Sequence, residues 1–244
     1  MPGAPGAVVA LTTRAGGSPP RTPRGPYDGL DLALHVGDDP VAVHASRDAL
    51  RATLAARGAG SLTFLEQVHG ADVAVVRGPA AAGAPDLPAV DAAVTATPGV
   101  ALAVLVADCV PVLLADPAAG VVGVAHAGRR GAVAGTALRA LAAMADLGAR
   151  DVVAVLGPSI CGRCYEVPAA LRDEVAATAP VAASTTWDGA PALDVAAVVL
   201  AQLRDAGVAV EQVPGCTAER PDLWSFRRDG GASGRTAGLA WVPA

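Results

Sequence analysis

The segment AVLVADCVPVLLADPAAGVVGVAHAGRRG, residues 103–131, is the most apolar region of the chain and decides its fold class. It reads almost entirely as buried β-strand, with turn residues at Asp116-Pro117 and Gly120. Buried strands carry few polar groups, yet this one contains Asp108-Cys109 and runs into a glycine-rich end that includes His126. The segment therefore predicts both a sheet core and a place where chemistry is concentrated.

Elements on either side of this segment complete a mixed pattern. Strands joined by turns are predicted within 61–76 (turn at 69–71), 89–109 (turn at 98–99), 120–126, 151–160 and the tail 220–243, where 224–228 reads as a strand. Helices are predicted over 38–58, 131–147, 168–179 and 194–207, and residues 14–31 read as a loop. Adjacent strands with interspersed helices indicate an α+β fold, and we expect a single domain over residues 1–244.

Composition and charge narrow the class of protein. The chain has 52% hydrophobic and 17% charged residues, which predicts a folded globular protein. Its net charge of −5 and the absence of a basic run argue against nucleic acid or an anionic membrane as partner. The start lacks the features of a secretory signal, and Asp108, Pro111 and Asp116 interrupt the apolar region too often for a membrane span. We expect a cytoplasmic protein with reduced cysteines.

Three side chains stand out as candidate metal ligands. His69 and His126 each lie at a strand end beside glycine, and Cys109 follows an apolar strand in the same way. Strand ends can converge on one point, and thiolate and imidazole groups are ligands that Zn²⁺ accepts, with a fourth position left for water or substrate. The alternative is a buried free cysteine with two ordinary loop histidines. For His35 and His44 a structural or surface role is expected.

Asp108 and the AHAGRRG segment, residues 125–131, add two further candidates. A carboxylate next to an apolar strand needs a partner or a raised pKa, so Asp108 is a candidate acid/base group, or else the cap of a turn. Backbone N–H groups at a strand-to-helix turn, together with Arg130, can hold a phosphate or another anion. Successive residues there cannot point the same way, so we expect at most one of Arg129 and Arg130 to face the site.

The sequence also contains one CxxC motif, formed by Cys161 and Cys164. It has no matching second pair, because Cys109 and Cys216 stand alone in the sequence. A structural Cys₄ zinc site is therefore not predicted, and we expect the pair to be reduced, with Cys161 dispensable.

Several blocks together resemble one known family. They are TTRAGG (12–17), LALHVGDDP (32–40), QVHG (67–70), ADCVPVLLADP (107–117), AHAGRRG (125–131), GPSICGRCYEV (157–167), CT (216–217) and WSFRRDGGASGR (224–235). In this order they resemble the laccase-domain family, whose members are labelled multicopper polyphenol oxidase, peptidoglycan editing factor or purine nucleoside phosphorylase. The resemblance implies a sandwich of two mixed β-sheets flanked by helices, similar to the catalytic domain of cytotoxic necrotizing factors.

The resemblance also implies roles for individual residues. The zinc ligands of the family match His69, Cys109 and His126, the residues already singled out by their positions. Catalytic roles are expected for Asp108 and Arg130, and substrate contacts for Arg14, Gln67, Cys164 and Arg227. The chain departs from the family pattern at three places: Arg129 stands where the family usually has Trp, Asp31 where it often has Asn, and Cys161 is extra.

The reaction that the resemblance implies is phosphorolysis of purine nucleosides. We expect a zinc-dependent purine nucleoside phosphorylase for adenosine, inosine and methylthioadenosine, with deamination of adenosine as a second activity. Its partners would be a small-molecule nucleoside and phosphate. The sequence does not indicate whether the chain is a monomer or an oligomer. Four histidines are too few for a multicopper laccase, so Zn²⁺ is favoured over the Cu²⁺ of the family label.

Three other functions remain open from the sequence. One is a hydrolase that edits peptidoglycan precursors. Another is a metal-free cysteine hydrolase with Cys109 as nucleophile and His126 as base. The third is a non-catalytic binding module, which the concentration of Asp, Cys, His and Arg at strand ends disfavours.

Overall fold

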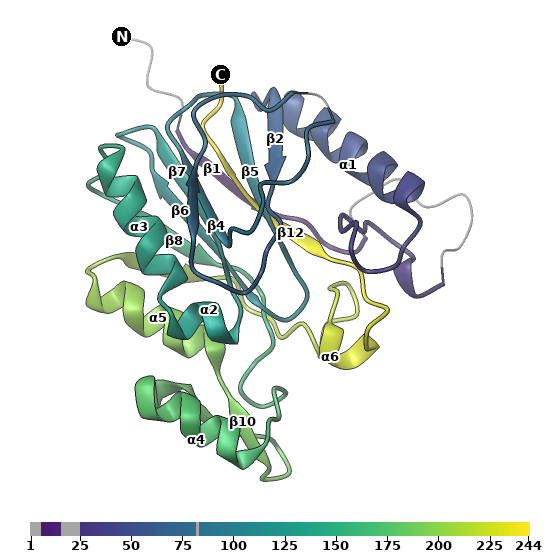
Figure 1. Ribbon diagram of the computed structural model, residues 1–244, viewed down its shortest axis with the longest axis vertical. Coiled ribbons are helices and arrows are strands. Elements are labelled where there is room, and N and C mark those ends of the chain that lie inside the picture. The colour runs from purple at the N-terminus through teal and green to yellow at the C-terminus, as the bar shows by residue number, and fades with distance from the viewer. Residues whose placement is uncertain (1–5, 16–24, 82) are drawn as a thin grey trace.

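Two mixed β-sheets packed face to face form the centre of the molecule, which a computed structural model describes for residues 6–15, 25–81 and 83–244 (Figure 1). The four-stranded sheet has the order β1 (Val8–Leu11), β12 (Thr236–Trp241), β5 (Val100–Val106) and β2 (Ser61–Phe64). The six-stranded sheet has the order β11 (Ala209–Gln212), β8 (Val153–Leu156), β6 (Val110–Asp116), β7 (Val121–Ala127), β4 (Ala92–Thr95) and β3 (Val73–Val75). Each sheet contains parallel and antiparallel pairs, as predicted.

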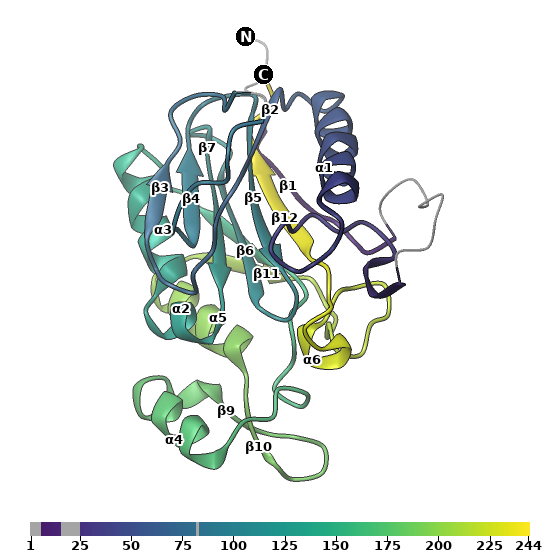
Figure 2. The ribbon, with the colours of Figure 1, turned by 45° about the vertical axis from the view of Figure 1, so that its right-hand side comes forward.

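Helices cover the two outer faces of this sandwich (Figure 2). The four-stranded sheet carries α1 (Pro40–Ala55), and the six-stranded sheet carries α2 (Arg129–Val133), α3 (Thr136–Asp146) and α5 (Val195–Asp205). At one end, α4 (Ala169–Thr178) packs on a hairpin of β9 (Ala183–Thr185) and β10 (Pro191–Leu193). Short helices complete the set: η1 (Gly25–Tyr27), η2 (Pro180–Ala182) and α6 (Phe226–Asp229). No helix of the described part of the chain could cross a membrane.

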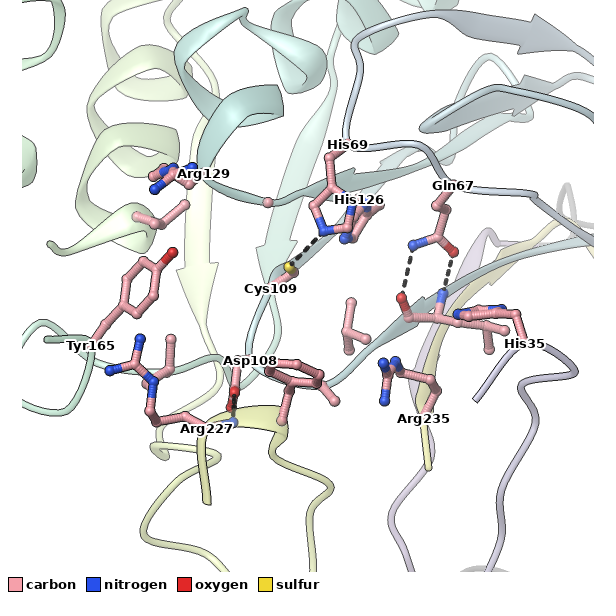
Figure 3. Close-up of a pocket in the computed structure, with 17 residues that line it drawn as sticks. His35, Gln67, His69, Asp108, Cys109, His126, Arg129, Tyr165, Arg227 and Arg235 are labelled. Carbon is pink, nitrogen blue, oxygen red and sulfur yellow. Dashed lines mark hydrogen bonds between the residues drawn. The ribbon is translucent and has the colours of Figure 1, made fainter. Parts of the chain in front are cut away.

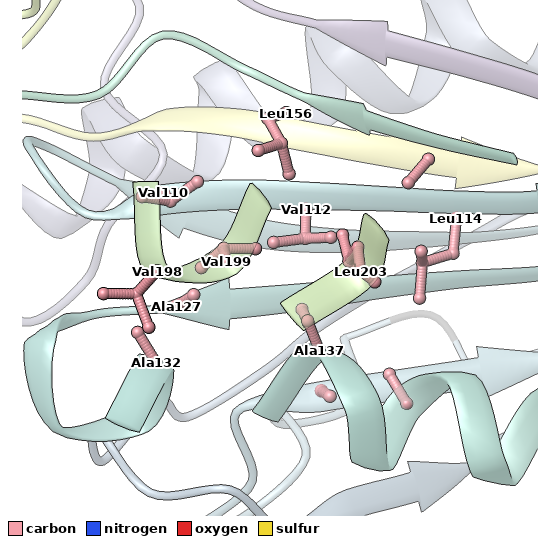
Figure 4. Packing of buried hydrophobic residues seen from close by; sticks show 14 of the residues in the cluster. Val110, Val112, Leu114, Ala127, Ala132, Ala137, Leu156, Val198, Val199 and Leu203 are labelled. Atoms are coloured by element: carbon pink, nitrogen blue, oxygen red, sulfur yellow. The ribbon is translucent and has the colours of Figure 1, made fainter. Parts of the chain in front are cut away.

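Burial on both faces explains why the central strands lack an alternating pattern. Along β6, Val112 and Leu114 pack against the helices, and Leu113 and Ala115 pack against the other sheet. Figure 4 shows the first of these layers, where Val112 and Leu114 meet side chains from α5. A strand covered on both faces is apolar at every position, which accounts for the run that dominates the sequence.

Two predicted elements are wrong. The predicted helix over 131–147 is divided into α2 and α3, because Gly135 adopts a left-handed backbone (φ 76°) that interrupts helical hydrogen bonding. The predicted strand at 224–228 is the short helix α6, which Ser225 caps by accepting a hydrogen bond from the backbone N–H of Arg228 (3.2 Å). The predicted loop over 14–31 lies partly outside the described residues.

Candidate functional site

Three strand ends meet at one edge of the sandwich and bring His69, Cys109 and His126 together (Figure 3). Cys109 directly precedes β6, His126 lies near the end of β7, and the antiparallel register pairs Pro111 with His126. His69 comes from the loop between β2 and β3. Its Nε2 lies 3.8 Å from the Cys109 Sγ, and one donor atom from each of the three side chains lies within 4.8 Å of the others.

A buried carboxylate, Asp91, holds two members of this cluster in place. Its Oδ1 lies 2.7 Å from the Nδ1 of His126 and accepts a hydrogen bond from the backbone N–H of His69 (3.0 Å). Its Oδ2 accepts hydrogen bonds from the backbone N–H groups of Val68 (3.2 Å) and Gly70 (2.6 Å). A carboxylate on Nδ1 fixes the histidine tautomer and leaves Nε2 as the ligand atom, an arrangement common behind metal-binding histidines.

The backbone at the cluster is constrained. His69 (φ 59°) and Asp108 (φ 87°) both adopt positive φ values that non-glycine residues rarely take. Gly128 allows the histidine ring to approach, because a Cβ there would lie 2.6 Å from the Cδ2 of His69 and 3.2 Å from the Cys109 Sγ. Such strain persists only where surrounding contacts enforce it, and it concentrates at functional sites.

Electrostatics polarise the cysteine and its histidine neighbour. Burial by itself would raise the pKa of Cys109, but the charge of His126 and hydrogen bonds from both histidines lower this pKa to about 6. Burial would lower the pKa of His126, but the Cys109 thiolate and the Asp91 carboxylate raise this pKa to about 9. The thiol is therefore ready to ionise at neutral pH, which is the state that metal binding and nucleophilic attack both require.

The cluster opens into a cavity of about 390 Å³, a size suited to a small organic ligand. Its polar wall includes His35, Gln67, Asp108, Arg129, Arg227 and Arg235, and its aromatic wall includes Tyr165 and Phe226. The guanidinium carbon of Arg227 lies 5.1 Å from the centre of the Tyr165 ring. Phe226 is 53% exposed although it is a large apolar side chain.

Asp108 and Gln67 line this cavity, and both also tie segments together. Asp108 accepts hydrogen bonds from the Thr217 hydroxyl and from the backbone N–H of Arg227, both at 2.6 Å. Gln67 exchanges two 2.8 Å hydrogen bonds with the backbone of Leu105 on β5. Each side chain thus positions a neighbouring loop, and a role toward substrate remains a proposal.

The two adjacent arginines have the opposite orientation to the one expected. Arg129 lines the cavity, whereas Arg130 is exposed and donates from Nη2 to the Val68 carbonyl (3.1 Å). The turn into α2 therefore directs the first arginine inward. Arg130 instead braces the loop that carries His69.

Two other expected substrate contacts lie away from the cavity wall. Arg14 packs over the Trp224 ring, with its guanidinium carbon 4.1 Å from the ring centre, and donates to the Asp28 carbonyl. Cys164 belongs to a second cluster, in which the fold places it near Cys161 and Cys216. Cys216 stands alone in the sequence, but β-bridge pairing of residues 159 and 216 joins its loop to the CxxC loop.

Sequence reasoning missed three residues of the site. Asp91 was hidden inside an apolar strand prediction, although a lone carboxylate in such a strand is itself a signal. His35 and Arg235 both line the cavity, and the Oδ1 of Asp31 accepts a hydrogen bond from the backbone N–H of Arg235 (2.8 Å). The departure from the family pattern at Asp31 therefore lies directly behind a cavity residue.

Comparisons with known proteins agree with this architecture. A purine nucleoside phosphorylase of Streptomyces coelicolor is 51% identical, with 97% of this chain and 96% of that protein covered. A purine nucleoside phosphorylase of Mycobacterium tuberculosis is 48% identical, with coverage of 95% and 90%. The crystal structure of YlmD from Geobacillus stearothermophilus superposes with a TM-score of 0.85 at 34% identity, covering 100% of this chain and 94% of that one.

A protein of Neisseria meningitidis has a similar structure, with a TM-score of 0.83, 33% identity and coverage of 100% and 97%. Residues 8–243 match the family model described as multi-copper polyphenol oxidoreductase laccase. This match covers almost the whole chain and confirms the resemblance drawn from the sequence blocks. The chain belongs to this laccase-like family.

Proposed function

We propose that this protein is a zinc-dependent purine nucleoside phosphorylase acting on adenosine, inosine and methylthioadenosine, with hydrolytic deamination of adenosine as a second activity. The observation that carries the proposal is the cavity itself, in which the His69, Cys109 and His126 cluster lies among guanidinium groups and aromatic rings. The names of the two relatives described above support the same reaction.

Phosphate binding is assigned to the arginines of the cavity. Among the described residues, the guanidinium groups of Arg129, Arg227 and Arg235 form no salt bridge with a carboxylate. Cations that line a cavity without a carboxylate partner favour an anionic ligand, and guanidinium groups bind phosphate with paired, charge-assisted hydrogen bonds. Arg129 and Arg227 lie on the side of the cavity that also carries Tyr165 (Figure 3).

Purine binding is assigned to the aromatic wall. Phe226 lines the cavity and is 53% exposed, and Tyr165 lies beside Arg227. Aromatic rings stack on the flat face of a purine and gain by covering their own apolar surface. In phosphorolysis a phosphate oxygen bonds to C1′ of the ribose as the bond from C1′ to the base breaks, so base and phosphate must be held at opposite sides of that carbon.

The donor set of the cluster fits a zinc ion. One thiolate and two imidazoles within 4.8 Å of one another match the ligand types of catalytic zinc sites, and Asp91 orients His126 for this purpose. A bound zinc ion would supply Lewis acidity at the face that opens into the cavity. Asp108, next to Cys109 and on the same wall, is the residue proposed to hold or release a proton during the reaction.

Two measurements on the purified protein test this proposal. Inosine with phosphate should give hypoxanthine and ribose 1-phosphate, and inosine without phosphate should give neither. Metal analysis should find zinc, and Cys109→Ser should lose the zinc ion of the cavity cluster together with the turnover, because a hydroxyl is a far poorer ligand than a thiolate. Zinc-loaded protein without phosphorolysis of any of the three nucleosides would contradict the proposal.

A second candidate, a metal-free cysteine hydrolase, is favoured by one observation. The opposite pKa shifts of Cys109 and His126 describe a thiolate beside an imidazolium, the pair that activates a nucleophilic cysteine. Chelation separates the two candidates. A cysteine hydrolase would keep its activity in the metal-free protein and lose it to iodoacetamide, whereas the phosphorylase would lose activity on chelation and regain it with added zinc.

A further inference from the structure

The fold assembles a second cluster of ligand-type side chains that the cavity chemistry does not use. One donor atom from each of Cys161, Cys164, Cys216 and Glu219 lies within 4.8 Å of the others. The Cys164 Sγ lies 3.5 Å from the Oε1 of Glu219, and the backbone N–H of Cys161 donates to the Cys216 Sγ (3.3 Å). From these contacts we propose a second metal site, a structural zinc site with three thiolate ligands and one carboxylate ligand.

The spacing of the four donor atoms suits one tetrahedral ion. Zinc binds thiolate sulfur at about 2.3 Å, which puts tetrahedral ligand atoms about 3.8 Å apart. The observed limit of 4.8 Å lies about 1 Å above this value, a difference that small side-chain rotations close.

The backbone around the pair has the form that a metal site needs. Residues 161–164 make a tight turn, in which the N–H groups of Cys164 and Tyr165 both donate to the Cys161 carbonyl (3.0 Å each). A second turn follows Cys216, whose carbonyl accepts hydrogen bonds from the N–H groups of residues 219 and 220. Two turns that face each other and supply two ligands each are the usual plan of a structural zinc site.

Ligand chemistry selects the ion. Three sulfur donors favour a soft or borderline cation and exclude magnesium or calcium, which bind oxygen ligands. Four protein ligands also leave no position for substrate, in contrast to the three-ligand cluster at the cavity. The second site therefore has a structural role, and its presence does not depend on the proposed phosphorylase activity.

The position of this site indicates what it stabilises. Cys164 is followed directly by Tyr165, and Cys216 by Thr217, whose hydroxyl donates to Asp108. An ion that joins the two turns would fix the cavity residue Tyr165 relative to Thr217 and, through the hydrogen bond of Thr217, relative to the cavity residue Asp108. Loss of the ion should therefore lower the melting temperature by several degrees and loosen the cavity wall.

Metal stoichiometry of variants purified under reducing conditions with zinc tests the proposal. We expect two zinc ions per chain in the wild type, one in Cys164→Ser, one in Cys109→Ser, and none in the double variant. Glu211→Gln, which changes an exposed glutamate on β11, is the control and should keep both ions. Whatever the cavity cluster binds, Cys164→Ser must hold one ion fewer than the wild type; equal contents would overturn the proposal.

Two further measurements keep the test decisive if Cys164→Ser fails to fold. Cobalt added to the Cys109→Ser protein should give intense thiolate-to-cobalt charge-transfer absorption. The double variant Cys109→Ser/Glu219→Gln should give an altered absorption band. A Cys109→Ser protein that shows no such band after cobalt is added would refute the site. Thiol titration of the denatured wild type without reductant should find four free thiols. Two missing thiols, assigned by peptide mapping to a disulfide between any two of Cys161, Cys164 and Cys216, would equally overturn the proposal.

Discussion

Substitution of Asp91 by Asn should show how much this carboxylate contributes to metal affinity and how much it contributes to the stability of the fold. The Asp91 carboxylate is buried and accepts hydrogen bonds from the imidazole of His126 and from three backbone N–H groups, two donors on each oxygen. Asn can place its NH₂ group in two ways. One orientation turns it toward His126 Nδ1 and forces the ring proton onto Nε2, the ligand atom. The other turns it toward Val68 and Gly70 and disrupts the loop of His69.

The magnitude follows from those contacts. Either orientation removes two hydrogen bonds to a charged acceptor. The first restores one, from the NH₂ group to His126 Nδ1, and leaves the His69 N–H without an acceptor, whereas the second leaves the N–H groups of Val68 and Gly70 without one. We expect a cost of about 3–5 kcal/mol of unfolding free energy. Loss of the carboxylate behind a metal-binding histidine lowers metal affinity by about 10- to 100-fold. Chemical denaturation of the metal-free protein measures the first effect, and zinc competition with a chromophoric chelator measures the second.

Asp116 provides a matched control at the far end of β6. Its carboxylate is also buried and accepts four backbone hydrogen bonds, two on each oxygen, but it contacts no histidine. Asp116→Asn should therefore lose about the same unfolding free energy as Asp91→Asn, about 3–5 kcal/mol, and keep the zinc affinity of the wild type. Equal zinc affinities in the two variants would refute the assignment of Asp91 to the cluster.

The stability difference between the wild type and Asp116→Asn should also depend on pH. Hydrogen bonds from the N–H groups of Ala119, Arg150 and Asp151 lower the pKa of Asp116 to about 2. A carboxyl with a lowered folded-state pKa stabilises the fold above its ordinary pKa, 3.8, and this stability is lost as the pH falls through about 2. The wild type should therefore lose its advantage over Asp116→Asn between about pH 4 and pH 2.

Four further substitutions probe the cavity and the turn beside it. Arg129→Ala should raise the KM for phosphate by about 10- to 100-fold, because one charged hydrogen bond contributes about 1.5–3 kcal/mol. Arg130→Ala should change this KM less than about threefold. Steady-state kinetics with varied phosphate measures both effects, and a larger effect of Arg130→Ala would contradict the prediction. Gly128→Ala should displace His69 and lower zinc affinity at least tenfold, as chelator competition would show. In Asp108→Asn, the amide can be oriented so that it keeps hydrogen bonds to both Thr217 and the Arg227 backbone, and the melting temperature of the variant should not change. If the carboxylate transfers a proton, kcat should fall by about 10²–10⁴-fold.

The strand and helix pattern predicts an α+β fold, and the family resemblance adds the sandwich of two sheets. Residues 103–131 are apolar at nearly every position, which marks the central strands. Cys109 directly precedes β6 and His126 lies near the end of β7, so pairing of these two strands brings both ligands together, and the loop between β2 and β3 adds His69. The resemblance to the family adds the same three residues from separate sequence blocks. For these parts, local pattern and tertiary structure agree.

Side-chain direction and long-range contacts could not be predicted in the same way. Which of two adjacent arginines faces the cavity depends on the backbone turn after Gly128, and the sequence favoured the wrong one. Asp91 stands out in the sequence as a lone carboxylate beside an apolar strand, but its role behind His69 and His126 is visible only from its four donors. Cys216 meets the CxxC pair through a contact that spans 55 residues, a separation that no spacing rule covers.

The orientation of Arg129 changes the meaning of the departure from the family pattern. On the sequence alone, an arginine in place of the usual Trp could lie on the surface without effect, since Arg130 matches the family's own arginine. In the structure, Arg129 lines the cavity, so the substitution exchanges an aromatic wall for a cation within reach of the ligand. Tyr165 and Phe226 still provide aromatic surface in this cavity. Under the proposed function, these rings would bind the base, and the additional charge of Arg129 should favour phosphate over the neutral nucleoside.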